Sequence, residues 1–183
     1  RRVLIVRPSA LGDVARSVCL AHSIKRVQPG CVAYNNRGVA KGALENYQGA
    51  IDDYTKAIEL NPDYAFAYNN RGIAKRALGD NPGAIDDYTK AIELDPNYAF
   101  AYNNRGVAKR ALENYQGAID DHTKAIELDP NYANAYNNRG IAKRALDDKA
   151  GAIQDYQKAA DLYEQQGNTE QYQNALNQIQ SLQ

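Results

Sequence analysis

Apolar residues recur along most of the chain with helical spacing, in segments that end at proline. Residues at i, i+1, i+4, i+7 and i+8 form one stripe of an amphipathic helix, and in the first such segment they are Ala50, Ile51, Tyr54, Ala57 and Ile58. The segment stops before Pro62, and its copies stop before Pro96 and Pro130, because proline disfavours a helical residue ahead of it. The pattern predicts an all-α fold.

A second helix precedes each of these segments. The first one is predicted from about Ala33 to Leu44, and its small residues Gly38 and Ala40 allow two helix backbones to approach closely. A short polar link follows. In one copy Pro82 stands in the first turn of the next helix, where its missing N–H costs nothing. The chain therefore reads as a series of helical hairpins.

The hairpins are copies of one unit. The segment Tyr34-Asn35-Asn36-Arg37-Gly38 returns every 34 residues, and residues 65–98 and 99–132 differ at only six positions. A fixed period of this length indicates a repeat architecture in which each unit covers its neighbour. The four units are residues 31–64, 65–98, 99–132 and 133–166.

The unit resembles the tetratricopeptide repeat (TPR). Its signature has an aromatic residue early in the first helix, a small residue four later, then alanine, aromatic, alanine and a closing proline. Those positions are filled by Tyr34, Gly38, Ala50, Tyr54, Ala57 and Pro62, and the set recurs. The resemblance implies an α-solenoid of helix-turn-helix repeats wound as a right-handed superhelix. Two departures, Arg37 and Lys41, recur in every unit, and we expect them to form ion pairs with aspartates of the second helix.

The two ends of the chain depart from the repeat. After the fourth unit, Gly167 is expected to end a helix and Asn168 or Thr169 to begin another. That helix, within residues 167–183, is predicted to cap the array with one apolar stripe. The stripe consists of Tyr172, Leu176, Ile179 and Leu182.

Residues 1–30 form an atypical segment, with a short extended stretch and a predicted helix over residues 10–28. They resemble the opening of the heptosyltransferase-like glycosyltransferases (family 9), which begin with a strand and a Ser-x-Leu-Gly-Asp turn. Three explanations stay open: a fused remnant, an artificial junction, or a helix recruited as an N-terminal cap. We favour the docked helix.

The amino-acid composition limits the classes of partner that the chain is expected to bind. Basic and acidic residues each number 22, which argues against a general nucleic-acid binder. No apolar run approaches the length of a membrane span. Two cysteines, Cys19 and Cys31, are too few for a disulfide framework, and we expect a cytoplasmic location. A protein or peptide is the expected partner, with a homo-oligomer through the N-terminal segment or the array ends as a further expectation.

Catalysis is not expected. Asp52-Asp53 recurs in later units, whereas an acid–base pair needs one site with divergent environments; we interpret Asp52 as an ion-pair partner of Lys56. His122 stands where the other units have tyrosine and is interpreted as a packing residue. No ligand cluster for a metal and no cofactor motif is found, so neither a metal site nor a cofactor is predicted.

The resemblance places a ligand on the concave face of the first helices. Asparagine offers a donor and an acceptor to a peptide backbone, phenylalanine can anchor apolar side chains, and arginine favours carboxylates. The predicted peptide-binding groove comprises Asn35, Phe66, Asn69, Ile73, Arg76, Phe100, Asn103, Val107, Arg110, Asn137 and Arg144.

Some TPR domains hold a chaperone's acidic C-terminus in a basic clamp. The clamp asparagine matches Asn70, but its basic partners would fall at Asn35, Phe100 and Asn104, so this mode is not expected. The predicted function is a noncatalytic scaffold for protein–protein interaction. The alternatives are a self-assembling structural repeat and a glycosyltransferase remnant or fusion.

Overall fold

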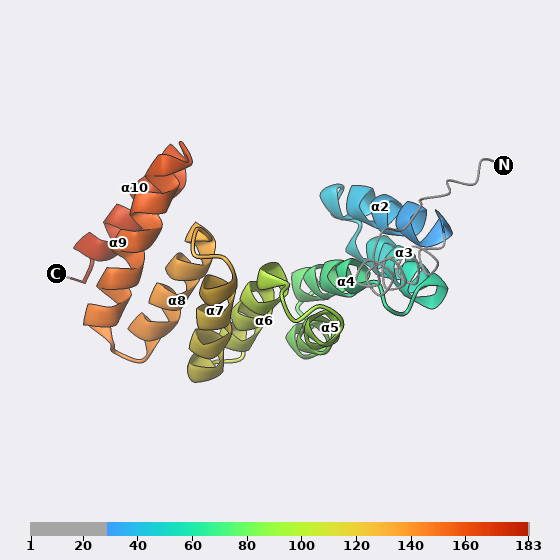
Figure 1. Ribbon diagram of the computed structural model, residues 1–183, viewed down its shortest axis with the longest axis horizontal. Coiled ribbons are helices and arrows are strands. Elements are labelled where there is room, and N and C mark those ends of the chain that lie inside the picture. The colour runs from blue at the N-terminus through green and yellow to red at the C-terminus, as the bar shows by residue number, and fades with distance from the viewer. Residues whose placement is uncertain (1–28, 183) are drawn as a thin grey trace, which may run out of the picture.

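The computed structural model describes residues 29–182, and these residues form nine α-helices and no strand (Figure 1). The predicted helix over residues 10–28 lies outside the described residues. In chain order the helices are α2 (Pro29–Ala43), α3 (Tyr47–Leu60), α4 (Ala65–Ala77), α5 (Asn81–Leu94), α6 (Ala99–Ala111), α7 (Tyr115–Leu128), α8 (Ala133–Ala145), α9 (Lys149–Gln165) and α10 (Thr169–Gln180).

The start predicted for the first helix was wrong. This helix begins at Pro29 and not at Ala33, because proline is tolerated in a first helical turn, where its missing N–H has no intrahelical partner. In α5, Pro82 occupies the first turn as expected.

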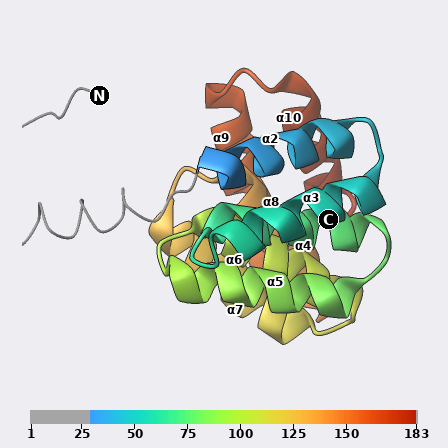
Figure 2. The same ribbon diagram turned by 90° about the vertical axis from the view of Figure 1, so that its right-hand side faces the viewer.

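The helices form antiparallel pairs stacked in sequence order. We call α2, α4, α6 and α8 the A helices, and α3, α5, α7 and α9 the B helices. Each A helix packs most closely on the B helix that follows it, and successive A helices also contact one another. Successive B helices do not pack together to a comparable extent. The array therefore curves with its A helices inside, and α5 and α7 lie on the opposite side from α2 and α10 (Figure 2).

Small residues and one aromatic ring fill each hairpin. Ala84, Ala91 and the ring of Tyr88 are fully buried in the second unit. A Cβ atom added at Gly72 would lie 2.7 Å from the Tyr88 ring. Glycine is thus required there because the ring packs directly against the A-helix backbone.

His122 occupies the equivalent aromatic position of the third unit, as predicted. It is fully buried, and neither ring nitrogen has a hydrogen-bond partner among the described residues. Burial lowers the pKa of His122 from 6.5 to about 4, because the charged imidazolium is poorly solvated there.

The lowered pKa makes stability depend on pH. The unfolded state binds a proton near pH 6.5 and the folded state only near pH 4, so folding stability is retained above pH 6.5 and falls as the pH drops toward 4. Between pH 7 and pH 5 we expect a loss of about 2 kcal/mol. His122→Tyr should remove this loss, and Tyr88→His should add a second one. Denaturant unfolding at both pH values measures the effect; equal pH profiles for all three proteins would contradict it.

The recurring arginine and lysine form the predicted ion pairs. Arg71 Nε and Nη2 donate to the two oxygens of Asp87 at 2.9 and 2.7 Å, and Lys75 Nζ lies 2.9 Å from Asp87 Oδ2. Arg71 Nη1 also donates to Thr55 Oγ1 of the preceding unit at 3.1 Å. Equivalent ion pairs fix Asp53, Asp121 and Asp155. The departures from the family signature thus join A helix to B helix and unit to unit.

The first unit shows the charge effect of this arrangement. The hydrogen bonds from the Arg37 guanidinium hold the pKa of Asp53 at about 2.

By contrast, the predicted pair between Asp52 and Lys56 was wrong. Lys56 Nζ instead lies 2.7 Å from Glu59 Oε2, because Glu59 stands three residues later on the same helix. The Asp52 carboxylate accepts a hydrogen bond from Gln48.

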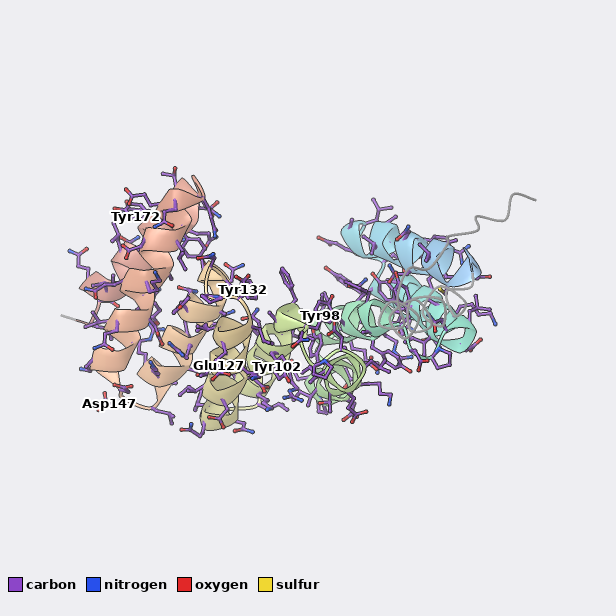
Figure 3. The ribbon with its side chains drawn as sticks, viewed as in Figure 1. Tyr98, Tyr102, Glu127, Tyr132, Asp147 and Tyr172 are labelled. Carbon is purple, nitrogen blue, oxygen red and sulfur yellow. The ribbon has the colours of Figure 1, made fainter. Side chains whose placement is uncertain are left out.

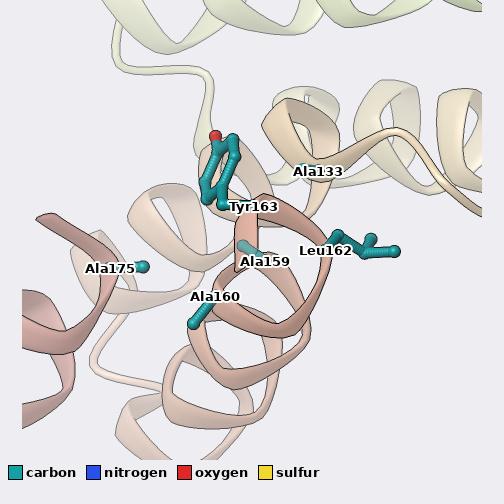
Figure 4. Packing of buried hydrophobic residues seen from close by; sticks show 6 residues of the cluster. All are labelled: Ala133, Ala159, Ala160, Leu162, Tyr163 and Ala175. Atoms are coloured by element: carbon teal, nitrogen blue, oxygen red, sulfur yellow. The ribbon is translucent and has the colours of Figure 1, made fainter. Parts of the chain in front are cut away.

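The last helix closes the array. Gly167, with φ 69°, follows the end of α9, and the Asn168 side chain accepts from Gln171 N at the start of α10. Buried Ala175 of α10 joins a cluster that contains Tyr163 and Leu162 of α9 (Figure 4). Among the described residues, no helix has the length and apolar character needed to cross a membrane.

Candidate functional site

The A helices contact one another along the inner side of the array, and several of their large apolar side chains are exposed. Phe66 and Phe100 are each 54% exposed, and Ile73 and Val39 are also exposed. Phe66 and Ile73 stand seven residues apart on α4, so they lie on one helix face. The residues of the predicted groove therefore include exposed apolar side chains.

The asparagines of the predicted groove take a different role from the one expected. Asn35, Asn69 and Asn103 are only 4–6% exposed. Each accepts, through Oδ1, a 3.0 Å hydrogen bond from the second asparagine of the next unit: Asn70 to Asn35, Asn104 to Asn69 and Asn138 to Asn103. These side chains connect successive A helices, and their buried oxygens are occupied. Asn137 is half-buried.

The three predicted arginines have no acidic partner among the described residues. Arg76, Arg110 and Arg144 form no ion pair with any described residue, whereas the arginine and lysine of the ion-pair network are each bound to an aspartate. Arg110 Nε is buried without a hydrogen-bond partner, and Arg144 donates to Gln178 of α10. Uncompensated positive charge thus follows the C-terminal ends of α4, α6 and α8.

A pocket of about 300 Å³ opens between the A helices of the first two units. Val39, Ile73 and Ala74 supply apolar walls, and Tyr54 and Asn70 also line it. Gly42 lies in this wall at the position that carries arginine in the other three units. The absence of a side chain at Gly42 leaves the space open, and this pocket was not predicted from the sequence.

An aromatic row, which sequence reasoning missed, runs along the other end of the A helices. Successive ring centroids lie 4.9 to 6.3 Å apart. The row consists of Tyr64, Phe66, Tyr98, Phe100 and Tyr132. Figure 3 places Tyr98 and Tyr132 above Tyr102 and Glu127, toward the inner side of the array. The available signal was the tyrosine that closes each of the first two units, two residues before a phenylalanine.

Burial raises the pKa of Tyr98 and of Tyr132 to about 12, so both stay neutral at physiological pH.

Within the described part of the chain, no group of histidine, cysteine, aspartate or glutamate side chains could hold a metal ion. The site therefore offers two kinds of contact: a basic edge beside an apolar pocket, and an aromatic edge.

Comparison with known families identifies the repeats. Sequence models described as tetratricopeptide repeat match residues 31–64 and 99–132, residues 53–86 and residues 133–165, and a TPR repeat model matches residues 72–110. The glycosyltransferase resemblance of residues 1–30 finds no support in these comparisons. No curated protein matches the chain significantly.

Solved structures agree with the family models. The first TPR of Spaghetti (RPAP3), bound to the HSP90 peptide SRMEEVD, is 30% identical; the alignment covers 66% of this chain and 97% of that one with a TM-score of 0.64. The TPR2B domain of yeast Sti1 in complex with pHsp70 is 28% identical, with 64% and 94% covered and a TM-score of 0.63.

MamA is 24% identical to this chain and shares its fold. The alignment covers 84% of this chain and 91% of MamA with a TM-score of 0.66. The family models, the solved structures, the recurring sequence signature and the stacked hairpins all indicate the same protein family. This chain belongs to the tetratricopeptide repeat family.

Proposed function

We propose that the protein is a noncatalytic scaffold whose inner groove binds an extended acidic peptide segment of a partner protein, with one apolar side chain of that segment held in the pocket at Gly42. The observation that carries the proposal is the row of arginines, Arg76, Arg110 and Arg144, without acidic partners. Guanidinium groups bind carboxylates with charge-assisted hydrogen bonds.

Similar domains bind protein segments, and one of those segments has acidic residues. The RPAP3 domain is bound to SRMEEVD, a peptide with an acidic end, and the Sti1 domain is in complex with pHsp70. The mode of contact in this chain is expected to differ. Asn70 donates to Asn35, and Phe100 and Asn104 supply no positive charge. We therefore expect SRMEEVD itself to bind weakly.

The test is selection from a random library of short displayed peptides, followed by measurement of the selected peptides in solution. We expect enrichment of peptides that combine several acidic residues with one leucine-sized or larger apolar residue. Replacing Arg76, Arg110 and Arg144 by glutamine should weaken these peptides by about tenfold or more, because charge-assisted hydrogen bonds contribute about 1.5–3 kcal/mol each. The salt dependence of binding should fall as well.

The control exchanges three exposed lysines that pair with a glutamate of their own helix, Lys56, Lys90 and Lys124, for glutamine. These B-helix side chains carry the same charge as the arginines, and their loss should leave binding unchanged. Enrichment of basic peptides, or equal loss in both triple variants, would overturn the proposal. Alanine at Asn69 or Asn103 would not test binding, because these side chains hold the array together.

A further inference from the structure

A second pocket lies along the aromatic row, away from the arginines. Its volume is about 540 Å³, and its walls include Phe66, Tyr98, Phe100, Asp95 and Asp129, together with Asn97, Ala99 and Leu128. We call it the aromatic–acidic pocket. The two phenylalanines in its wall are half-exposed, so aromatic surface and carboxylates face the same space.

No described residue neutralises the carboxylates of this pocket. Each of the B-helix aspartates, such as Asp87, is bound by an arginine and a lysine. Asp95 and Asp129, by contrast, form no ion pair with any described residue. Within residues 29–182, each accepts, through Oδ1, the backbone N–H of Asn97 or Asn131, at 3.1 and 3.0 Å. The pocket therefore carries uncompensated negative charge beside its aromatic rings.

This combination selects one class of ligand. Aromatic ring faces attract cations, and a cation close to two carboxylates gains Coulombic energy when water is partly excluded. An apolar stem would pack on the phenylalanines while its charged end reaches the acids. A neutral ligand would desolvate the carboxylates without compensation, which costs free energy.

We infer that the aromatic–acidic pocket binds the side chain of a lysine or arginine in a polypeptide partner. The inference does not depend on the acidic peptide proposed for the groove, because the two sites use different residues at opposite ends of the A helices. It can hold for a separate basic segment of the same partner or for a different one.

The composition of the chain gives a direct probe. Phe66 and Phe100 are its only two phenylalanines, so incorporation of para-fluorophenylalanine yields two fluorine resonances, both in this pocket. The labelled protein is titrated with the N-acetyl N-methylamides of lysine and arginine, and with that of norleucine as the neutral control. We expect both resonances to shift with lysine and arginine, and to shift about tenfold less at equal norleucine concentration.

A matched variant separates charge from shape. Asn61 occupies the position of Asp95 in the first unit with nearly the same backbone, φ −143° and ψ 91° against −137° and 91°. It also accepts the equivalent N–H, from Asp63, at 3.3 Å. Asp95→Asn with Asp129→Asn should therefore keep the fold, as a preserved melting temperature would show, while binding the two cationic probes about tenfold more weakly.

Three results with the amide probes would overturn the inference, and the choline comparison below gives a fourth. The first is an absence of fluorine shifts with either cationic amide, and the second is a response to norleucine as large as that to lysine. The third is unchanged binding in the double asparagine variant. Choline and its neutral isostere 3,3-dimethylbutanol test the source of the cation: a response to choline stronger than that to the lysine amide would assign the pocket to a free quaternary amine and contradict the polypeptide partner.

Discussion

Replacement of Asp87 by alanine is expected to lower the free energy of unfolding by about 2–4 kcal/mol. Asp87 is buried, and it binds Arg71 through two hydrogen bonds and Lys75 through an ion pair. Its removal leaves two positive charges facing each other beside the helix interface without a counter-ion. The cost arises from this uncompensated charge more than from the lost pair itself.

The neighbouring residue provides the control for this prediction. Asp86 has the same chemistry and lies one position earlier on α5, but it is exposed and forms no ion pair with any described residue. Asp86→Ala should change the free energy of unfolding by less than about 0.5 kcal/mol. Urea unfolding followed by circular dichroism measures both variants. Equal destabilisation by the two substitutions would show that the buried network contributes little.

Arginine at Gly42 is expected to abolish binding of the selected acidic peptides while making the protein more stable. The substitution copies the residue that the other three units carry at this position, and it fills the pocket of about 300 Å³. A helical glycine is destabilising by about 1 kcal/mol relative to a good helix former. The added charge alone would favour an acidic ligand, so a loss of binding reports the filled pocket.

Gly42→Ala separates the two effects. An added Cβ would lie 3.9 Å from Tyr54 Oη, an ordinary contact, so alanine raises helix propensity and leaves most of the pocket open. The alanine variant should be stabilised to a similar extent and bind the peptides nearly as the parent protein does. Fluorescence anisotropy with labelled peptides gives the affinities. Parent-like binding by the arginine variant, or loss in both variants, would exclude the pocket as the anchor.

The repeated elements could be predicted because each unit carries the same helix, turn and proline signals. The pairing of Arg37 with Asp53 was also predictable, since both belong to one hairpin and recur together. The interaction between Asp52 and Lys56 was mispredicted because spacing along one helix does not rank competing partners, and Glu59 lies closer.

Contacts between units were harder to predict. The role of Asn69 depends on Asn104, 35 residues away, and periodicity within one helix assigns both asparagines to a polar face. The aromatic row was missed because Tyr98 closes one unit in a loop and meets Phe100 of the next. The pocket at Gly42 could not be predicted, because Val39 and Ile73 line the same space from two different helices.

The junctions between units have a consequence for how the array keeps its order. The bond from the second asparagine to the first is 3.0 Å at all three junctions, and the arginine–threonine bond is 3.1 Å at all three. Side-chain complementarity therefore does not distinguish a correct neighbour from another unit. Covalent linkage does, through the high effective concentration that it gives to the adjacent unit. The order of the repeat units is therefore set by their covalent connection. A unit that is duplicated or deleted in register should form the same hydrogen bonds with its new neighbours.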